Sequence, residues 1–526
     1  MMKSWFDRLL GKNTEMTFPV VWDAQQPSIY ACLAESYAQA EPLPADARVL
    51  ANQPMSDSDE ICWAPGALEG TMIYHFGVGN DGPDATEILS ALHQVQKKPD
   101  TKAIHALYQL INQGSPVHYI DELLSAIPQS QNLRAEALCK LVVWLATASP
   151  DRNVVKFAMA LMAYFPQQRT VEILQVLARH DEFTLYAVVA LRAMLEPEEY
   201  APVWYGMAQR VTGWGRIHLM ERMPEQMDDE LRRWLLREGF SNSVMNEYTA
   251  VNCAVRGGLL AALETEHDDA LLMGAAEMLY AMLMGGPVPG ISVYDDAPLS
   301  CLRYLEKVLA CKPSHPLHFL TARHIGTWVE SETSLDPATA QHLAEKSKQV
   351  QAMSLWDDLI PQILASGEGY VYYLAIQVSR ERKQDPWPSL FERQCKDSAE
   401  DNWYQLMQTE DAAQAQQVCT LAQAQFDLPA IASGPALSSG VGPNWKMHSK
   451  LDAVVQELKR FPSMGWPLLE AALQSPVIRN RQMALNALEA WPAPVLSEHR
   501  DYLTACAERE PHEEVQARLW ALLAVD

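Results

Sequence analysis

The chain has 526 residues, of which 41 are Lys or Arg and 66 are Asp or Glu, so its formal net charge is −25 at pH 7. This balance argues against nucleic-acid binding, because a protein that grips phosphates needs clustered cations. Hydrophobic residues make up 48% and charged residues 20%, which supplies a sizeable core and excludes a wholly disordered chain.

The nine cysteines are odd in number, widely spread and without a CxxC pair. Such usage is typical of reduced thiols rather than of a disulfide framework. The first residues lack the uninterrupted apolar run of a signal peptide, and no window reaches the ~20 apolar residues that a bilayer requires. We therefore expect a cytoplasmic protein that does not enter a membrane.

Residues 1–83 are interrupted by prolines and predict a small irregular N-terminal cap. Within it we expect one helix near residues 28–40 and a strand over residues 71–76. A GxGxxG motif follows, formed by Gly77, Gly79 and Gly82. A dinucleotide-binding unit would need a second strand after the next helix, and Pro99 and another helical segment stand there instead. The motif is therefore interpreted as a glycine-rich turn that leads into the first helix, and no cofactor is expected.

From residue 84 onward, apolar residues recur with the spacing of amphipathic helices. Short breaks containing Pro or Asp separate these segments, as at Pro99, Pro150 and Asp336. The pattern predicts an all-α solenoid of about ten helical pairs from residue 84 to the end of the chain. Its first part covers residues 84–428, with a break near 285–298. Residues 429–444 are rich in Gly, Ser and Pro and are predicted to be a linker before C-terminal repeats over 447–526.

Three predicted helix starts share a Pro followed by regularly spaced apolar residues, at residues 149–161, 475–488 and 510–522. The second start also carries Arg481. Together they resemble the first helices of HEAT-repeat proteins, the armadillo-like α-solenoids, although Lys156 and Gln516 stand where that family prefers arginine. The resemblance implies a scaffold fold whose members mostly bind proteins, and it implies no reaction.

One cluster contains plausible metal donors within a short stretch: Cys311, His315, His318 and His324. Pro316 separates the first two histidines, and His324 falls off the helix face of His318. Buried or helix-starting histidines are the competing interpretation, and the sequence leaves the two open. No GxSxG, P-loop, HExxH or papain-like cysteine context is present, so we predict no catalytic residues.

Two aromatic residues suggest partner-binding positions. Trp214 lies between Gly213 and Gly215 at a predicted turn, and Tyr294 stands beside Asp295 and Asp296 on the long Gly/Pro loop. Aromatic anchors with acidic rims are typical of protein-binding surfaces, whereas a Trp that covers a helix end is the plainer interpretation.

The resulting hypothesis is a non-enzymatic, acidic scaffold that binds a basic partner protein. One version of it is a bacterial immunity protein that neutralises a basic toxin domain. The alternatives are a metal-dependent enzyme that uses the Cys311–His324 cluster and a structural adaptor that holds several partners.

Overall fold

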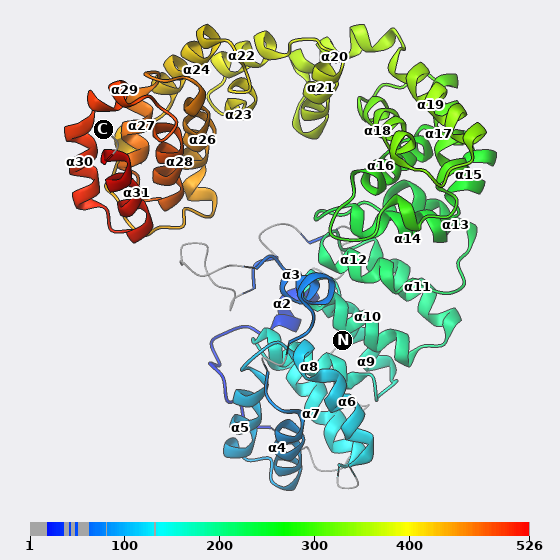
Figure 1. Ribbon diagram of the computed structural model, residues 1–526. Coiled ribbons are helices and arrows are strands. Elements are labelled where there is room, and N and C mark those ends of the chain that lie inside the picture. The colour runs from blue at the N-terminus through cyan, green and yellow to red at the C-terminus, as the bar shows by residue number, and fades with distance from the viewer. Residues whose placement is uncertain are drawn as a thin grey trace. The chain divides into compact units, whose positions relative to one another are not determined.

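The computed structural model describes residues 18–35, 42–43, 48–50, 63–79, 82–130 and 133–524. These residues are predominantly helical (Figure 1), and an isolated parallel bridge between Ser438 and Val477 is the only β-type pairing among them. The predicted all-α helical-repeat solenoid is therefore confirmed. In this part of the chain, no helix combines the length and apolar character needed to cross a bilayer.

The described chain packs as two compact units, of which the first holds the described residues up to 313 together with 317–352. In chain order, its helical elements are α2 (Ile29–Glu35), α3 (Ala67–Thr71), η2 (Met72–Phe76), α4 (Ala85–Lys97), α5 (Thr101–Ile111), η3 (Pro116–His118), α6 (Ile120–Ala126), η4 (Ile127–Gln129), α7 (Ala135–Ala148), α8 (Arg152–Met162), α9 (Gln168–Leu177), α10 (Asp181–Met194), α11 (Pro197–Ala208), α12 (Trp214–Glu221), α13 (Asp229–Trp234), η5 (Leu235–Gly239), α14 (Glu247–Gly257), α15 (Leu259–Thr265), α16 (Asp269–Met284), η6 (Ile291–Val293), α17 (Ala297–Ala310), α18 (Leu317–Ser331) and α19 (Pro337–Gln351).

The helices of this unit stack in the manner of a solenoid. Along one row, α8 packs against α10, α10 against α12, α12 against α14, α14 against α16 and α16 against α18. The apolar stripes predicted from the sequence form its core, since Ile104, Leu107, Val154 and Phe157 are all almost fully buried. Stacking of neighbours buries faces that no single hairpin could cover alone.

Aspartates begin several helices, as the breaks in the sequence predict. Asp100 accepts a hydrogen bond from the backbone N–H of Ala103 at 3.0 Å, and Asp336 accepts one from Thr339 at 2.9 Å. Each bond satisfies a donor that the first helical turn leaves free.

The second unit holds residues 314–316 and 353–524. Its elements are α20 (Leu355–Ser366), α21 (Gly369–Glu381), α22 (Trp387–Lys396), α23 (Trp403–Leu406), α24 (Ala412–Gln425), α25 (Leu428–Ile431), η7 (Pro443–Trp445), α26 (Lys446–Val455), η8 (Gln456–Arg460), α27 (Trp466–Leu473), α28 (Ile478–Leu488), α29 (Ala493–Ser497), α30 (Arg500–Arg509) and α31 (Glu513–Leu523). Sequential packing continues here, with α26 against α28 and α28 against α31.

The Gly/Ser/Pro segment at residues 429–444 makes backbone hydrogen bonds to the chain that follows it. Gly434 N–H donates to the carbonyl of Gln474 at 2.8 Å, and Ile478 N–H donates to the carbonyl of Ser438 at 3.1 Å. The segment thus lies along the loop that precedes α28, and the boundary between the two compact units falls instead after residue 352.

The predicted strand at residues 71–76 is wrong, because this stretch is helical. Residues Ala67–Thr71 form α3, and Met72–Phe76 continue it as a π-helical turn. The β-branched and aromatic residues of this stretch favour a strand locally. A strand, however, needs a neighbouring strand to satisfy its backbone hydrogen bonds, whereas a helical turn makes these bonds within itself. The predicted helix at residues 28–40 is present as α2, and residues 36–40 lie outside the described ranges.

Candidate functional site

The helix formed by α3 and η2 docks on the solenoid through two glycines. Gly66 has a φ of +74°, and a Cβ added to it would lie 2.7 Å from the carbonyl oxygen of Asp181. A Cβ added to Gly70 would lie 2.2 Å from the Trp214 ring. Only residues without a side chain permit this approach, which brings the intervening Glu69 into the interior.

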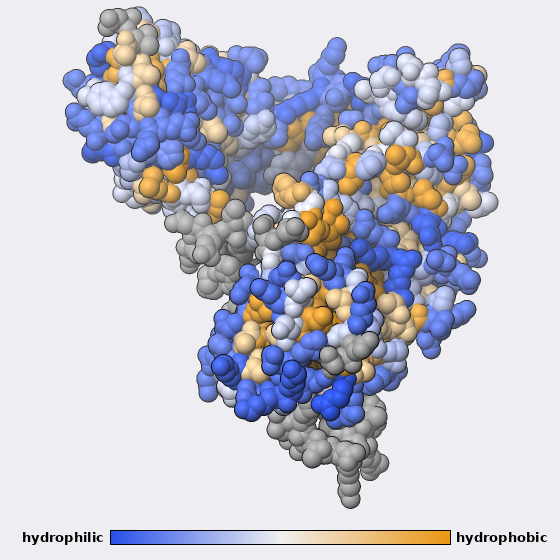
Figure 2. Space-filling model, turned by 60° about the horizontal axis from the view of Figure 1, so that its bottom comes forward, coloured by the Kyte–Doolittle hydropathy of each residue, from blue (hydrophilic) through white to orange (hydrophobic). Residues whose placement is uncertain are grey.

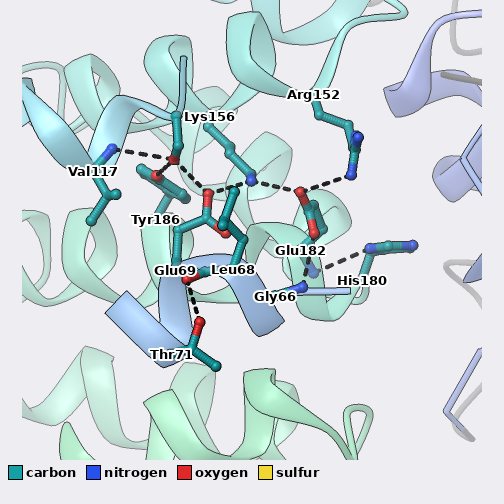
Figure 3. A network of polar contacts seen from close by, with 11 residues as sticks. Gly66, Leu68, Glu69, Thr71, Val117, Arg152, Lys156, His180, Glu182 and Tyr186 are labelled. Carbon is teal, nitrogen blue, oxygen red and sulfur yellow. Dashed lines mark hydrogen bonds and ion pairs between the residues drawn. The ribbon is translucent and has the colours of Figure 1, made fainter. Parts of the chain in front are cut away.

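Glu69 enters a buried network of charges (Figure 3). Lys156 Nζ, on α8, lies 2.5 Å from Glu69 Oε1 and 2.6 Å from Glu182 Oε1 on α10. Ser115 Oγ also donates to Glu69 Oε1, at 2.7 Å, and Arg152 lies 3.4 Å from Glu182. The side chains of Lys156, Glu69 and Glu182 are 1%, 2% and 8% exposed, so these ions depend on one another rather than on water.

The network fixes the charges of Lys156 and Glu182. Burial by itself opposes the cation, but Glu69 and Glu182 outweigh it and raise the pKa of Lys156. Burial likewise opposes the Glu182 carboxylate, yet Lys156 and Arg152 lower its pKa to about 2. Gly66 N–H adds a hydrogen bond to Glu182 Oε2 at 2.8 Å. Lys156 and Glu182 therefore stay ionised near neutral pH.

Asp181 and His180 continue the network toward α12. Asp181 Oδ1 accepts hydrogen bonds from the N–H groups of Gly213 at 3.0 Å and Gly215 at 2.9 Å, which are at the N-terminus of that helix. Burial raises the pKa of Asp181, and these donors offset the rise only in part. Burial lowers the pKa of His180, whose ring bridges the Glu182 backbone N–H and the carbonyl of Arg48. Asp181 and His180 are buried and thus join α10 to the start of α12 and to the chain at Arg48.

An aromatic cluster lies beside the charges. Trp214 and Tyr248 have ring centroids 5.1 Å apart, and Tyr74 packs on both, at 5.9 Å and 5.1 Å. His218 lies against Trp214 and Tyr74, and neither of its ring nitrogens has a hydrogen-bond partner in the described part of the chain. Burial, assisted by nearby Arg222, lowers the pKa of His218 to about 3.

The structure corrects two of the predicted partner-binding residues. Trp214 is 6% exposed and forms the floor of the aromatic cluster, and Tyr294 is 4% exposed with its hydroxyl 2.8 Å from Ser300 Oγ. Tyr74 and Tyr248, both distant in sequence, pack on the Trp214 ring, and both predicted anchors are buried, so neither presents a surface anchor. Asp295 and Asp296 are exposed, as a solvated loop requires.

The weak metal candidates have other surroundings. His318 is buried with Nδ1 2.9 Å from the Tyr304 hydroxyl, and the His324 ring packs edge-on against Tyr280. Cys311 is half-buried, with its thiol 3.6 Å from the carbonyl of Val308, and burial lowers the pKa of His315. Across the described residues, no three His, Cys, Asp or Glu side chains converge in a way that could hold a metal ion.

The GxGxxG motif follows a helix rather than the strand that a dinucleotide fingerprint requires. Gly77 has a φ of +74°, the carbonyl of Gly79 is 2.7 Å from His118 Nδ1, and Asp84 caps α4 shortly after Gly82. Residues 80–81 lie outside the described ranges. The structure thus lacks the local context that would place a pyrophosphate here.

The sequence prediction did not include Glu69, Lys156 and Glu182 as interacting residues. One signal was present: Lys156 interrupts an apolar run and departs from the arginine that the HEAT-like pattern favours. A lysine at a core position demands a carboxylate partner, but the sequence does not identify which one. No protein-family model, curated protein or solved structure matches the chain.

Proposed function

We propose that this protein is a non-enzymatic scaffold that binds a basic partner protein through its acidic surface. The supporting observation is where the charges lie. The most deeply buried cations, Lys156 and Arg481, are neutralised by internal carboxylates, whereas exposed loops carry acidic residues such as Asp295 and Asp296. With a net charge of −25, long-range attraction would favour a cationic partner.

The helical-repeat architecture supports the same proposal. Stacked hairpins present extended surfaces, and binding proteins along such surfaces is the usual role of solenoids. The resemblance to HEAT-repeat proteins agrees with this role. A cytoplasmic immunity protein that neutralises a basic toxin domain is the most concrete version, because electrostatic complementarity alone would bring such a pair together rapidly.

Affinity capture tests the proposal. The tagged full-length chain is incubated with lysate at low and high salt, and the retained proteins are identified and quantified. We expect one basic protein in near-stoichiometric amount, retained less as salt rises. Retention of a multi-subunit set would favour the adaptor, and retention of no basic protein would contradict the proposal.

Metal analysis of the same preparation separates the proposal from a metal-dependent enzyme. The scaffold requires no bound metal, so we expect a substoichiometric content that His318→Ala leaves unchanged. Stoichiometric zinc that is lost in His315→Ala or His318→Ala would overturn the non-enzymatic assignment.

A further inference from the structure

Exposed apolar side chains occur in the segments that border the aromatic cluster. Phe76 is 78% exposed, Met284 is 49% exposed and Met245 is 38% exposed. Figure 2 shows that hydrophobic residues interrupt the largely hydrophilic surface on the face it presents. Large exposed aromatic and thioether groups are depleted on surfaces that face only water, so a group of them marks an interaction site.

The three segments that carry these side chains meet near the start of α14. Phe76 follows His75, whose Nε2 lies 2.5 Å from the hydroxyl of Tyr248. Met245 lies just before α14 and accepts a backbone hydrogen bond from Tyr248 N–H at 3.3 Å, and a Cβ built on Gly286 would lie 3.9 Å from Met245 Cε. Met284 ends α16 just before that glycine.

The base of this surface is a packed apolar cluster. Trp214, Ile217, Tyr248 and Ala67 form a buried apolar cluster, and Val288 from the Gly/Pro loop packs against it. The loop is anchored at its far end, because a Cβ on Gly290 would lie 2.4 Å from the carbonyl of Met282. Methionine side chains adapt to varied shapes because their thioether chains are unbranched and flexible. Methionines above a packed apolar cluster are therefore suited to binding an apolar helix face.

Carboxylates surround the surface. Glu247 lies against Gly286, and Glu277 accepts a hydrogen bond from Asn246 at 3.3 Å. Glu221 is exposed beside Tyr74 and has Arg222 as its ion-pair partner at 3.3 Å. Glu221 and Glu247 therefore form the rim among these residues, and Arg222 pairs with Glu221.

We propose that this surface, defined by Phe76, Met245, Met284 and Val288 with Glu221 and Glu247 at its rim, docks an amphipathic helix of the partner protein. The bound helix presents its apolar face to the methionines and its Lys or Arg side chains to the rim. This assignment rests on the proposed function, because it identifies the surface through which the scaffold binds its basic partner. Helix-in-groove recognition uses apolar anchors spaced along one helix face, and the rim charges set specificity and association rate.

A synthetic peptide tests the surface without the natural partner. The probe is a fluorescent helical peptide of about 18 residues, or five turns, with Leu and Trp on one face and Lys on the other. A second peptide replaces every Lys by Glu. We expect the full-length chain to bind the Lys peptide at least tenfold more tightly than the Glu peptide in anisotropy titrations.

Two double variants locate the binding. The double variant Phe76→Ser with Met284→Ser should weaken binding of the Lys peptide by roughly tenfold or more, because central apolar anchors are lost. Glu221→Lys with Glu247→Lys should weaken it and flatten its salt dependence. The matched control is Tyr370→Ser with Tyr373→Ser on α21, which are 60% and 43% exposed, and it should change affinity less than twofold. Circular dichroism melting confirms that each variant remains folded.

The outcomes separate the two proposals. Equal weakening by the site and control variants, equal binding of the two peptides, or no binding of the Lys peptide overturns the surface assignment. If the wild-type chain captures a basic partner and the site variants capture it equally well, the surface is wrong and the proposed function stands. If the wild-type chain captures no basic protein, the proposed function fails.

Discussion

Lys156 Nζ lies 2.5 Å from Glu69 Oε1 although the two residues are 87 positions apart in the chain, and both side chains are almost fully buried. The pair joins the short helix α3 to α8 in the solenoid. A buried ion pair contributes little when compared with well-packed apolar residues, but the loss of one partner is costly because the other charge stays behind. The pair therefore makes the docking of α3 specific.

Removal of the Lys156 charge should destabilise the first unit strongly. Lys156→Met leaves Glu69 and Glu182 buried without their cation, and we expect a loss of about 3–5 kcal/mol in the free energy of unfolding. Lys140→Met is the matched control, because its pair with Glu136 is largely exposed and is worth about 0.3–0.5 kcal/mol. Urea denaturation of both variants measures the difference, and similar losses would show that the buried network is not stabilising.

The close approach of α3 predicts opposite effects for two Gly→Ala substitutions. Gly70→Ala forces a methyl group into the Trp214 ring and should cost about 1–3 kcal/mol. Gly206→Ala, in α11, meets no atom within 4 Å and should stabilise by about 0.5–1 kcal/mol through helix propensity. Thermal denaturation of the two variants gives the comparison, and a neutral Gly70→Ala would mean that α3 does not pack as described.

His218 predicts a specific loss of stability in acid. Its pKa is about 3 in the folded protein and 6.5 when exposed, so the unfolded chain binds the proton more tightly. The contribution of the neutral His218 ring to the free energy of unfolding is fully present above pH 6.5. It falls as the pH drops toward 3, by up to about 1.4 kcal/mol per pH unit. When the pH falls from 7.5 to 4.5, the free energy of unfolding of His218→Phe should therefore decrease by about 2–3 kcal/mol less than that of the wild type.

The control for this prediction is His105→Phe, which changes an exposed histidine on α5. It should keep the acid sensitivity of the wild type. At pH 7.5 we expect His218→Phe to be close to neutral, since the ring makes no hydrogen bond in the described chain that the substitution would break. A pH dependence identical to that of the wild type would show that His218 is not buried as a neutral ring.

The hydrogen bonds of Arg481 indicate that a positive charge alone cannot replace this residue in the second unit. It is fully buried, donates to both oxygens of Glu510 at 2.8 Å and 2.9 Å, and donates to the carbonyl of Ser475 at 2.7 Å. Arg481→Lys keeps the charge but loses the planar fork, and we expect a cost of about 2–3 kcal/mol. Arg518→Lys, at the more exposed pair with Glu489, should cost less than about 1 kcal/mol. Equal costs in guanidinium denaturation would contradict the role assigned to the fork.

The sequence was sufficient to predict the helices but not the contacts between distant segments. The period of apolar residues predicted α5 and α26, because each buries one stripe against neighbouring helices. It also predicted α8, although that helix is buried on all sides from Val154 to Met162. It mispredicted residues 71–76, where local β propensity yields to docking against Trp214. The burial of Trp214 and Tyr294 also depends on chain far from them in sequence, which periodicity does not report. The Lys156 partners escaped prediction for the same reason.

The central claim is that an acidic repeat surface attracts a basic protein, and the association rate measures this most directly. The protein captured by the full-length chain is mixed with it in stopped-flow experiments at several salt concentrations. We expect a partner with a basic surface and a rate constant that falls steeply as ionic strength rises from about 20 to 300 mM. A rate that is independent of salt, or a partner without a basic surface, would contradict it.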